Sequence, residues 1–101
     1  MRPEQERDYE KLYKQMQDFG GNYNYDLVRK AFELCVLKHE GQKRCTNEDY
    51  YIHPFNVALI IVTLGMDSES IAAALLHDVV EDTDTTVEDI KRDFGDDVAL
   101  L

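Results

Sequence analysis

The sequence predicts an all-α protein, a helical bundle of about five to six helices. Apolar residues recur at three- and four-residue steps over most of the 101 residues, which is the spacing of one helix face. Glycine, proline and capping residues divide the chain into helix-sized segments. The nearly continuous apolar run 55–64 favours a buried helix over a strand, because Pro54 precedes it and Gly65 follows it.

The first expected helix covers residues 3–18 and has a narrow apolar stripe, so we expect it at the edge of the domain. The residues of the stripe are Tyr9, Leu12, Tyr13 and Met16. The pair Gly20-Gly21 ends this helix. We therefore expect two parts, an N-terminal helix with its turn over residues 1–22 and a main region over residues 23–101.

A second helix is expected over residues 25–40, with a cap formed by Asn24 or Asp26 and a stop at Gly41. Its apolar face is broad enough to lie in the core. The residues of this face are Leu27, Val28, Ala31, Phe32, Leu34, Cys35 and Leu37. The third helix begins at His53-Pro54, since proline suits the first helical turn.

The fourth helix is capped by Asp67 or Ser68 and runs to about Val80, and residues 81–84 then form an acidic loop. The fifth helix, 87–94, has Thr85 or Thr86 as its cap. We expect it to bury three residues, Val87, Ile90 and Phe94. A further helix begins at Asp96 and stops inside an apolar pattern, so we expect the bundle to be incomplete at its C-terminus.

The stretch 71–84 carries the strongest chemical signal. His77 and Glu81 lie one turn apart on a helix, with Asp78 and Asp82 on the adjoining face. These carboxylates follow a buried Ala/Leu run. Burial of a charged carboxylate costs roughly several kcal/mol unless the carboxylate is paired or binds a metal. A divalent metal or a polar ligand is therefore one hypothesis. The alternative is an amphipathic helix whose acidic end is solvated.

Two further features precede this stretch. The segment 42–52 is a long loop for a compact domain and carries Lys43 and Arg44 beside Tyr50 and Tyr51. Such a pairing suits an anion or a nucleobase, and a solvated loop with one tyrosine packed inward explains it as well. His53 follows directly, where a lone histidine is more often a capping or packing residue than a ligand.

Composition excludes several classes of function. The net charge of -10 argues against binding DNA by bulk electrostatics, although a small phosphorylated ligand is compatible with it. Cys35 suits a core thiol and Cys45 an exposed loop. Their ten-residue spacing does not indicate a disulfide framework, which favours a cytoplasmic location. No signal peptide and no membrane-spanning run is present in the sequence.

Three segments taken together resemble a known family. They are His39-Glu-Gly-Gln-Lys-Arg44, Tyr50-Tyr-Ile-His53-Pro54 and Ala72-Ala-Ala-Leu-Leu-His77-Asp78-Val-Val-Glu81-Asp82-Thr83-Asp84. A distant histidine with an adjacent His-Asp pair resembles the HD-domain metal-dependent phosphohydrolases. The longer strings resemble the hydrolase domain of the RelA/SpoT (p)ppGpp synthetase/hydrolase family, over about residues 23–101. The resemblance implies an HD-domain-like helical bundle, of which this chain would be the N-terminal part.

The resemblance also implies roles for single residues. His53, His77 and Asp78 would bind Mn²⁺, a metal that imidazole and carboxylate ligands suit. Glu81 and Asp82 would position and deprotonate the attacking water. Arg44 would stack on the guanine base, while Lys43 and Tyr50 would line the nucleotide pocket. The reaction would release pyrophosphate from the 3′ position of guanosine tetra- or pentaphosphate, leaving GDP or GTP.

The sequence departs from the family in the loop and at the C-terminus. Where the family has Lys-Ser-Gly-Glu-Pro-Tyr, this chain has residues 45–50, so Cys45 replaces a cation and Asp49 adds a negative charge. Asn47 in place of glycine is a mild change, since asparagine tolerates a left-handed backbone. The family's fourth metal ligand, an aspartate, is expected beyond residue 101. Exposed apolar helix faces would then favour a homo-oligomer.

Two other functions stay open at this point. The altered loop 45–49 is compatible with an HD-type phosphohydrolase that acts on a different nucleotide. A non-catalytic interaction module that keeps only the helical scaffold is the other alternative. The intact pairs His77-Asp78 and Glu81-Asp82 favour an enzyme, and the missing fourth ligand favours the interaction module.

Overall fold

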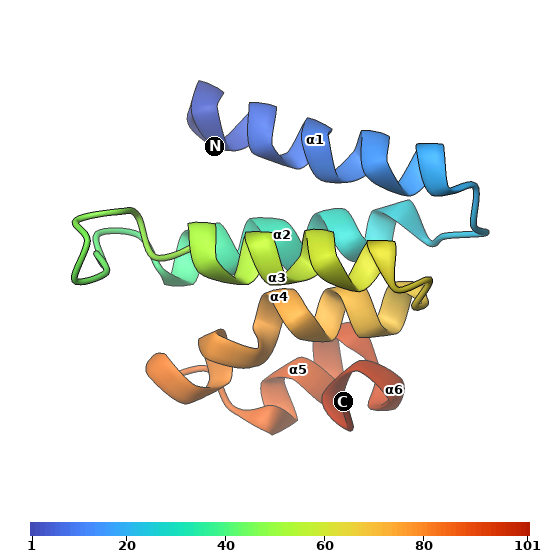
Figure 1. The fold of residues 1–101 in the computed structure, drawn as a ribbon. Coiled ribbons are helices and arrows are strands. Elements are labelled where there is room, and N and C mark those ends of the chain that lie inside the picture. Colours follow the sequence, from blue (N-terminus) through green and yellow to red (C-terminus); the bar gives the residue numbers. More distant parts are fainter.

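A computed structural model describes all residues from 1 to 101 and contains six helices (Figure 1). No strand is present, so the all-α prediction is confirmed. The six helices are α1 (Pro3–Phe19), α2 (Tyr25–Lys38), α3 (Ile52–Thr63), α4 (Ser68–Asp82), α5 (Val87–Phe94) and α6 (Asp96–Ala99). No helix combines the length and the apolar character that a membrane span requires.

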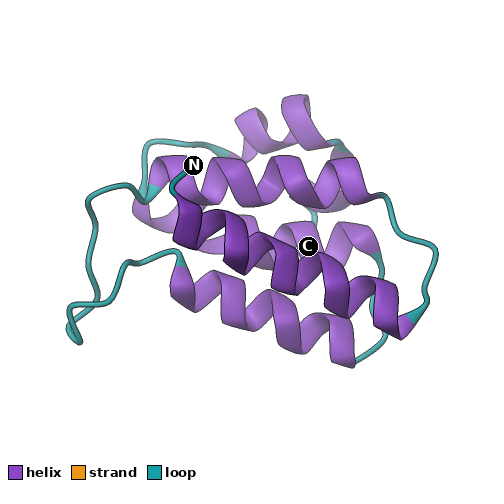
Figure 2. Cartoon of the chain, turned by 90° about the horizontal axis from the view of Figure 1, so that it is seen from above, coloured by secondary structure: helices purple, strands orange, loops and turns teal.

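Helix α4 is the central element of the bundle. It packs against α2 and α3 along most of its length, and α6 also contacts it. Figure 1 shows α1 above α2 and α3, with α4 below them and the short helices α5 and α6 beneath α4. The same bundle seen from above has long, roughly aligned helices with loops at both ends (Figure 2). Residues at the end of α4 therefore lie on a well-supported helix.

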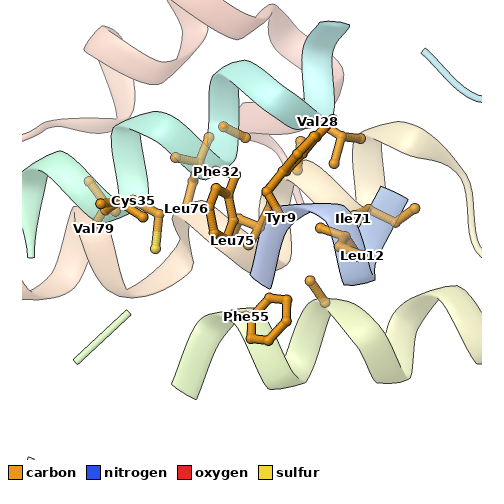
Figure 3. Packing of buried hydrophobic residues seen from close by; sticks show 14 of the residues in the cluster. Tyr9, Leu12, Val28, Phe32, Cys35, Phe55, Ile71, Leu75, Leu76 and Val79 are labelled. Carbon is orange, nitrogen blue, oxygen red and sulfur yellow. The ribbon is translucent and has the colours of Figure 1, made fainter. Parts of the chain in front are cut away.

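The core is formed mainly by α1, α2, α3 and α4. Phe32 of α2 is fully buried, and its ring meets Tyr51 and Phe55 edge-on at centroid distances of 6.1 and 6.0 Å. Tyr9 of α1 packs on the same ring at 5.4 Å (Figure 3). Leu12 of α1 is also fully buried, so the first helix shares the core with the main region and is more than an edge element.

Local sequence sets most of the helix ends. Asn24 caps α2 by accepting a hydrogen bond from the Leu27 amide, and Asp67 caps α4 by accepting one from the Ser70 amide. Thr86 forms a capping box with Asp89 at the start of α5. Each cap satisfies a backbone N–H that the first helical turn leaves unpaired. Of the caps that the sequence left open, Asn24, Asp67 and Thr86 are the ones used.

Two helix ends and two core positions differ from the sequence-based expectations. Helix α2 stops at Lys38 instead of residue 40, because His39 takes the cap position. Helix α4 continues to Asp82, so Glu81 and Asp82 lie on the helix and not in a loop. Leu37 and Val87 are about two-thirds and one-half exposed, since they lie on the outer faces of their helices.

Candidate metal centre and nucleotide-binding loop

The last turns of α4 and the first turn of α3 bring the predicted site residues together. His77, Asp78, Glu81 and Asp82 all lie on α4, and His53 lies on the first turn of α3. Helices α3 and α4 pack against each other directly. The packing of α3 against α4 therefore places His53 beside the His77-Asp78 pair. The spacing in the sequence was compatible with this arrangement but did not determine it.

Asp78 joins the two histidines. One carboxylate oxygen, Oδ2, lies 3.8 Å from Nε2 of His53, and the other, Oδ1, lies 3.4 Å from Nδ1 of His77. The Asp78 side chain is only 17% exposed, against 47% for His53 and 64% for His77. Only the His77 contact is within hydrogen-bond distance, and a mostly buried carboxylate is stabilised by a positive partner.

Neighbouring pairs of these groups lie close enough together to be candidate ligands of a divalent cation. Two atoms bound to one ion at about 2.1 Å each lie at most about 4.2 Å apart. Each pair taken singly is within that limit, but His77 faces Asp78 with Nδ1 and Glu81 with Nε2, and one imidazole gives only one nitrogen to an ion. Imidazole nitrogen and carboxylate oxygen are suitable donors for Mn²⁺, Fe²⁺ or Zn²⁺. The residues present therefore fit a metal.

The tightest set of possible ligands is not the expected one. Ligand atoms of His77, Asp78 and Glu81 all lie within 4.8 Å of one another. His53 is outside this set, although it contacts Asp78. His77 and Asp78 are common to both sets, so these two residues form the centre of the cluster, with His53 on one side and Glu81 on the other.

Cys35 lies beneath the cluster and is not a candidate ligand. Its side chain is buried in the core, and burial, with a smaller contribution from the Asp78 charge, raises the pKa of the thiol to about 12. The thiolate that binds metals is therefore absent near neutral pH. Cys35 is a core thiol and Cys45 an exposed one, and both are free, as the sequence predicts.

Asp82 makes a contact that sequence reasoning did not foresee. The hydroxyl of Tyr50 donates a hydrogen bond of 2.9 Å to Oδ2 of Asp82. The Tyr50 ring stacks on the imidazole of His39, with ring centroids 4.7 Å apart and planes 29° from parallel. The bond to Asp82, followed by burial, raises the pKa of the Tyr50 phenol to about 12. The phenol therefore remains a donor at all physiological pH values.

The loop before α3 folds back on itself as a short hairpin. Lys43 and Asp49 pair as an isolated antiparallel bridge, and the Arg44 amide donates to the Glu48 carbonyl at 2.9 Å. Asn47 turns the chain with φ of 68°, a left-handed conformation that asparagine adopts more readily than most residues. The prediction for Asn47 is thus confirmed.

Both cations of the loop are paired with acids of the same loop. The Lys43 ammonium group contacts the Asp49 carboxylate, and the Arg44 guanidinium lies 3.6 Å from the Glu48 carboxylate. Asp49 also accepts a 2.7 Å hydrogen bond from Arg2, at the N-terminus. Its lysine partner, and to a smaller extent Arg2, hold the pKa of the Asp49 carboxyl below its usual value.

His39 and Arg2 are the residues that sequence reasoning passed over. His39 lies within one of the quoted motifs, but its position at a helix end does not predict that its imidazole stacks on the Tyr50 ring. Arg2 is 47 positions from Asp49 in the sequence, and no local pattern links them. Only the packing of the N-terminal helix against α2 and α3 brings them close.

A shallow groove runs beside the cluster between α3 and α4. His53, His77 and Asp78 form one end of it, and apolar side chains continue it toward the other end of the helices. The remaining lining residues are Pro54, Val57, Ile61, Met66, Ser70, Ala73, Ala74 and Leu101. The cluster thus forms the polar end of a mainly apolar groove, where solvent and a ligand can reach it.

The fold and the cluster define an all-helical protein with a surface site of histidines and carboxylates. A family model described as "HD domain" matches residues 31–101. The chain belongs to the HD-domain family. The His77-Asp78 pair that gives the cluster its centre falls inside the matched region.

Characterised proteins show the same relationship in more detail. Over 74 residues the chain is 58% identical to a guanosine-3′,5′-bis(diphosphate) 3′-pyrophosphohydrolase of Aquifex aeolicus, covering 73% of this chain and 11% of that protein. It is 46% identical over 74 residues to a GTP pyrophosphokinase of Streptomyces coelicolor, covering 73% and 9%. A GTP pyrophosphokinase rsh of Brucella melitensis is 38% identical over 95 residues, covering 94% and 12%.

These matches confirm the resemblance to the N-terminal HD region of RelA/SpoT proteins. The chain spans about a tenth of the length of the curated relatives that it matches. The activities in the names of those relatives belong to much longer proteins.

Proposed function

We propose that this chain carries a metal-dependent HD hydrolase site for (p)ppGpp, which removes pyrophosphate from the 3′ position and leaves GDP or GTP. The observation that supports this best is the position of Asp78 between His53 and His77, with Glu81 and Asp82 on the next turn of α4. The similarity to a named 3′-pyrophosphohydrolase supports the choice of substrate.

His53, His77 and Asp78 would hold the metal, for which we propose Mn²⁺. When bound, the ion supplies Lewis-acid polarisation of a phosphoryl oxygen and lowers the pKa of a bound water. Imidazole nitrogen and carboxylate oxygen have the right chemistry for this role, and the position of Asp78 near both histidines supports the proposal.

Glu81 and Asp82 would accept the proton of the attacking water. The water oxygen forms a bond to the phosphorus next to the ribose 3′ oxygen, and the bond from that phosphorus to the 3′ oxygen breaks. The leaving oxygen takes up a proton and becomes the 3′ hydroxyl, so that pyrophosphate and GDP or GTP result. Both carboxylates are solvent-facing and one turn beyond the metal ligands, where a water can reach them.

The loop would hold the nucleotide. We propose that Arg44 stacks on the guanine base, that Lys43 contacts a phosphate and that the Tyr50 ring lines the pocket. Arg44 and Tyr50 are partly buried while Lys43 is exposed. We also propose the two-part division at residues 22 and 23 and, from the two free cysteines, a reducing cytoplasmic location.

One specific observation favours a second candidate function. The loop cations are neutralised by Glu48 and Asp49, and Cys45 replaces a cation of the family pattern. A nucleotide with fewer phosphates than ppGpp would tolerate this loop better than a polyanion does. The chain would then be an HD-type phosphohydrolase with a different nucleotide substrate, and a non-catalytic module would release no product from any nucleotide.

The experiment compares the wild-type chain with His77→Ala and Asp78→Asn variants. Mn²⁺ binding is measured by the electron paramagnetic resonance signal of the free ion, and pyrophosphate release is measured from ppGpp and from a panel of nucleotides. We expect both variants to weaken Mn²⁺ binding about tenfold or more and to abolish release. Asp96→Asn, an exposed acid on α6, is the matched control and should change neither measurement.

The results separate the alternatives. Release from ppGpp that disappears in both variants supports the proposal. Release from another nucleotide alone supports the second candidate function. A folded chain that binds Mn²⁺ but releases nothing contradicts enzymatic function, and unchanged Mn²⁺ binding in Asp78→Asn contradicts the metal site itself.

A further inference from the structure

Tyr50 connects three parts of the candidate site. Its hydroxyl donates to Asp82 at the end of α4, and its carbonyl accepts a hydrogen bond of 3.2 Å from the His53 amide at the start of α3. Its amide donates to the Gln42 carbonyl across the loop hairpin at 3.1 Å. One residue thus holds the loop, the α3 histidine and an α4 carboxylate in a fixed arrangement.

Asp82 depends on this contact more than its neighbours do. It is the last residue of α4 and its side chain faces solvent. Glu81 has His77 as a partner, and Asp78 has both histidines. The bond from Tyr50 is the only hydrogen bond or ion pair that the Asp82 side chain makes. Without it, an exposed aspartate samples several rotamers.

The Tyr50 ring is itself fixed from behind. It stacks on His39, which caps α2 and is only 3% exposed. The Nε2 atom of His39 is buried and has no hydrogen-bond partner, a cost of about 1–3 kcal/mol for a typical buried polar group. The buried imidazole of His39 is a flat surface on which the phenol ring of Tyr50 packs.

We propose that Tyr50 is a positioning residue, whose hydroxyl holds the Asp82 carboxylate in the orientation needed to accept a proton from the attacking water. The proposal rests on the proposed hydrolase function, and it gives the tyrosine hydroxyl a role separate from contact between its ring and the nucleotide. His39 supports the ring and so acts one step further away. The hydroxyl donates its hydrogen bond to Oδ2 of Asp82, which leaves the other carboxylate oxygen free to accept the proton.

Tyr51 provides a matched control within the same loop. Its hydroxyl donates a 2.7 Å hydrogen bond to Oδ2 of Asp8 on α1, so the bond joins the same two chemical groups. Tyr51 is buried in the core and its bond points away from the cluster, toward the N-terminal helix. Loss of a tyrosine-to-aspartate hydrogen bond can therefore be tested beside the site and away from it.

The test measures kcat and KM for pyrophosphate release by the wild-type chain, Tyr50→Phe, Tyr51→Phe, Asp82→Asn and the double variant Tyr50→Phe/Asp82→Asn. Tyr50→Phe keeps the ring and its stacking on His39. We expect its kcat to fall about 10- to 100-fold, as for other residues that orient a reacting group, with KM changed less than about threefold. Tyr51→Phe should keep the wild-type kcat. The double variant should be no slower than Asp82→Asn.

A second measurement does not depend on activity. The phenol of Tyr50 is titrated by ¹³C NMR of labelled tyrosine in the wild-type chain and in Asp82→Asn. Because the Asp82 carboxylate is the largest cause of the raised pKa, we expect that pKa to fall toward the ordinary value of 10.0 in Asp82→Asn. The pKa of Tyr51 should not move.

The outcomes distinguish the two proposals. A wild-type chain that releases no pyrophosphate overturns the proposed function, and the phenol titration then decides whether the Tyr50–Asp82 bond exists. An active wild-type chain with an unchanged kcat in Tyr50→Phe overturns the positioning role alone. A rise in KM with kcat unchanged also overturns it, because that result assigns the hydroxyl to nucleotide binding.

Discussion

Asp49 determines how much positive charge the loop can offer a nucleotide. From the sequence it is an extra negative charge near a polyanionic substrate. In the structure its carboxylate is shared by Lys43 and Arg2, so it also neutralises a cation proposed to contact a phosphate. A phosphate must therefore displace an internal anion from Lys43 before it can bind there.

Asp49→Asn is expected to increase the affinity for ppGpp about fivefold. Removal of the Asp49 charge leaves Lys43 without an internal anion that competes with a substrate phosphate. The expected gain of about fivefold is modest because water screens exposed charge pairs. Affinity is measured by calorimetry at constant Mn²⁺ and salt concentrations. Asp93→Asn, which removes an exposed acid paired with Arg92 on α5, is the control and should have no effect.

An unchanged or weaker affinity in Asp49→Asn would show that Lys43 does not contact the nucleotide. The increase should also shrink at high salt, since exposed charge pairs are screened. If the affinity for ppGpp rises equally in the Asp93→Asn control, the increase comes from the general change in net charge and not from the loop.

Single residues of the site were predictable to different degrees. Helical spacing predicted that His77, Asp78, Glu81 and Asp82 lie near one another, although the helix was expected to end at Val80 and in fact includes Glu81 and Asp82. The positive φ of Asn47 agrees with the tolerance of asparagine for that conformation. The partner of Asp82 could not be predicted, because Tyr50 lies 32 positions away. Pairing between a loop and a helix end depends on tertiary packing, which the local sequence does not encode.

At the level of helices, the start signals were more reliable than the end signals. Helix starts depend on a side-chain cap that can be recognised, such as Asn24 or Asp67. Helix α4 extends past its expected end at Val80 to Asp82, although acidic residues are unfavourable at the negative end of the helix dipole. Thr83 ends the helix, and its hydroxyl donates to the Val79 carbonyl.

Asp67→Ala is expected to lower the free energy of unfolding by about 1 kcal/mol at pH 7, the usual cost of losing an N-cap. A change of that size lowers Tm by about 4–8 °C in a domain of this length. The hydrogen bond from the Ser70 amide holds the pKa of the Asp67 carboxyl below its ordinary value of 3.8. The stabilisation is therefore complete above that value and is lost as the pH falls through the lowered pKa.

Thermal unfolding followed by circular dichroism checks this prediction across pH 7 to 2. The stability gap between wild type and Asp67→Ala should narrow as the solution becomes more acidic than about pH 4. Asp67→Asn retains a capping oxygen and should lose little stability at pH 7. A gap that stays constant down to pH 2 would show that the charge of Asp67 makes no contribution.

At the scale of the whole molecule, the all-helical class and most of the core followed from apolar periodicity. Phe32, Cys35 and Leu75 lie where that pattern places them, and all are buried. The position of α1 was underestimated. Its narrow stripe predicted an edge helix, yet Leu12 and Met16 are fully buried, because α1 packs against both α2 and α3.

Self-association through exposed apolar residues remains a prediction. Ile60 and Leu64 are one turn apart on the outer side of α3 and its end, with exposed fractions of 58% and 66%, and Met66 follows at 41%. Exposed apolar residues close together in the sequence favour association between copies. We expect the mass measured by light scattering to rise with concentration, and an Ile60→Lys/Leu64→Lys variant to stay monomeric.

An Ile60→Gln/Thr63→Lys variant is a useful comparison. Thr63 lies on the same helix and is exposed, so this variant adds a charge while Leu64 and Met66 of the apolar group are kept. If the Ile60→Lys/Leu64→Lys variant associates as strongly as the wild-type chain, the contact between copies does not involve these residues. A wild-type chain whose mass does not change with concentration would contradict the prediction altogether.

The position of α4 also sets a gradient of local stability along a single helix. One face of α4, formed by Ile71, Ala72, Leu75, Leu76 and Val79, is buried in the bundle, while Glu81 and Asp82 are exposed. Amide hydrogens in the buried turns should exchange with solvent only when the whole protein unfolds, and those of the last turn through small local openings. The segment proposed for catalysis therefore belongs to the most persistent helix and yet can rearrange around a substrate at little cost to the rest of the fold.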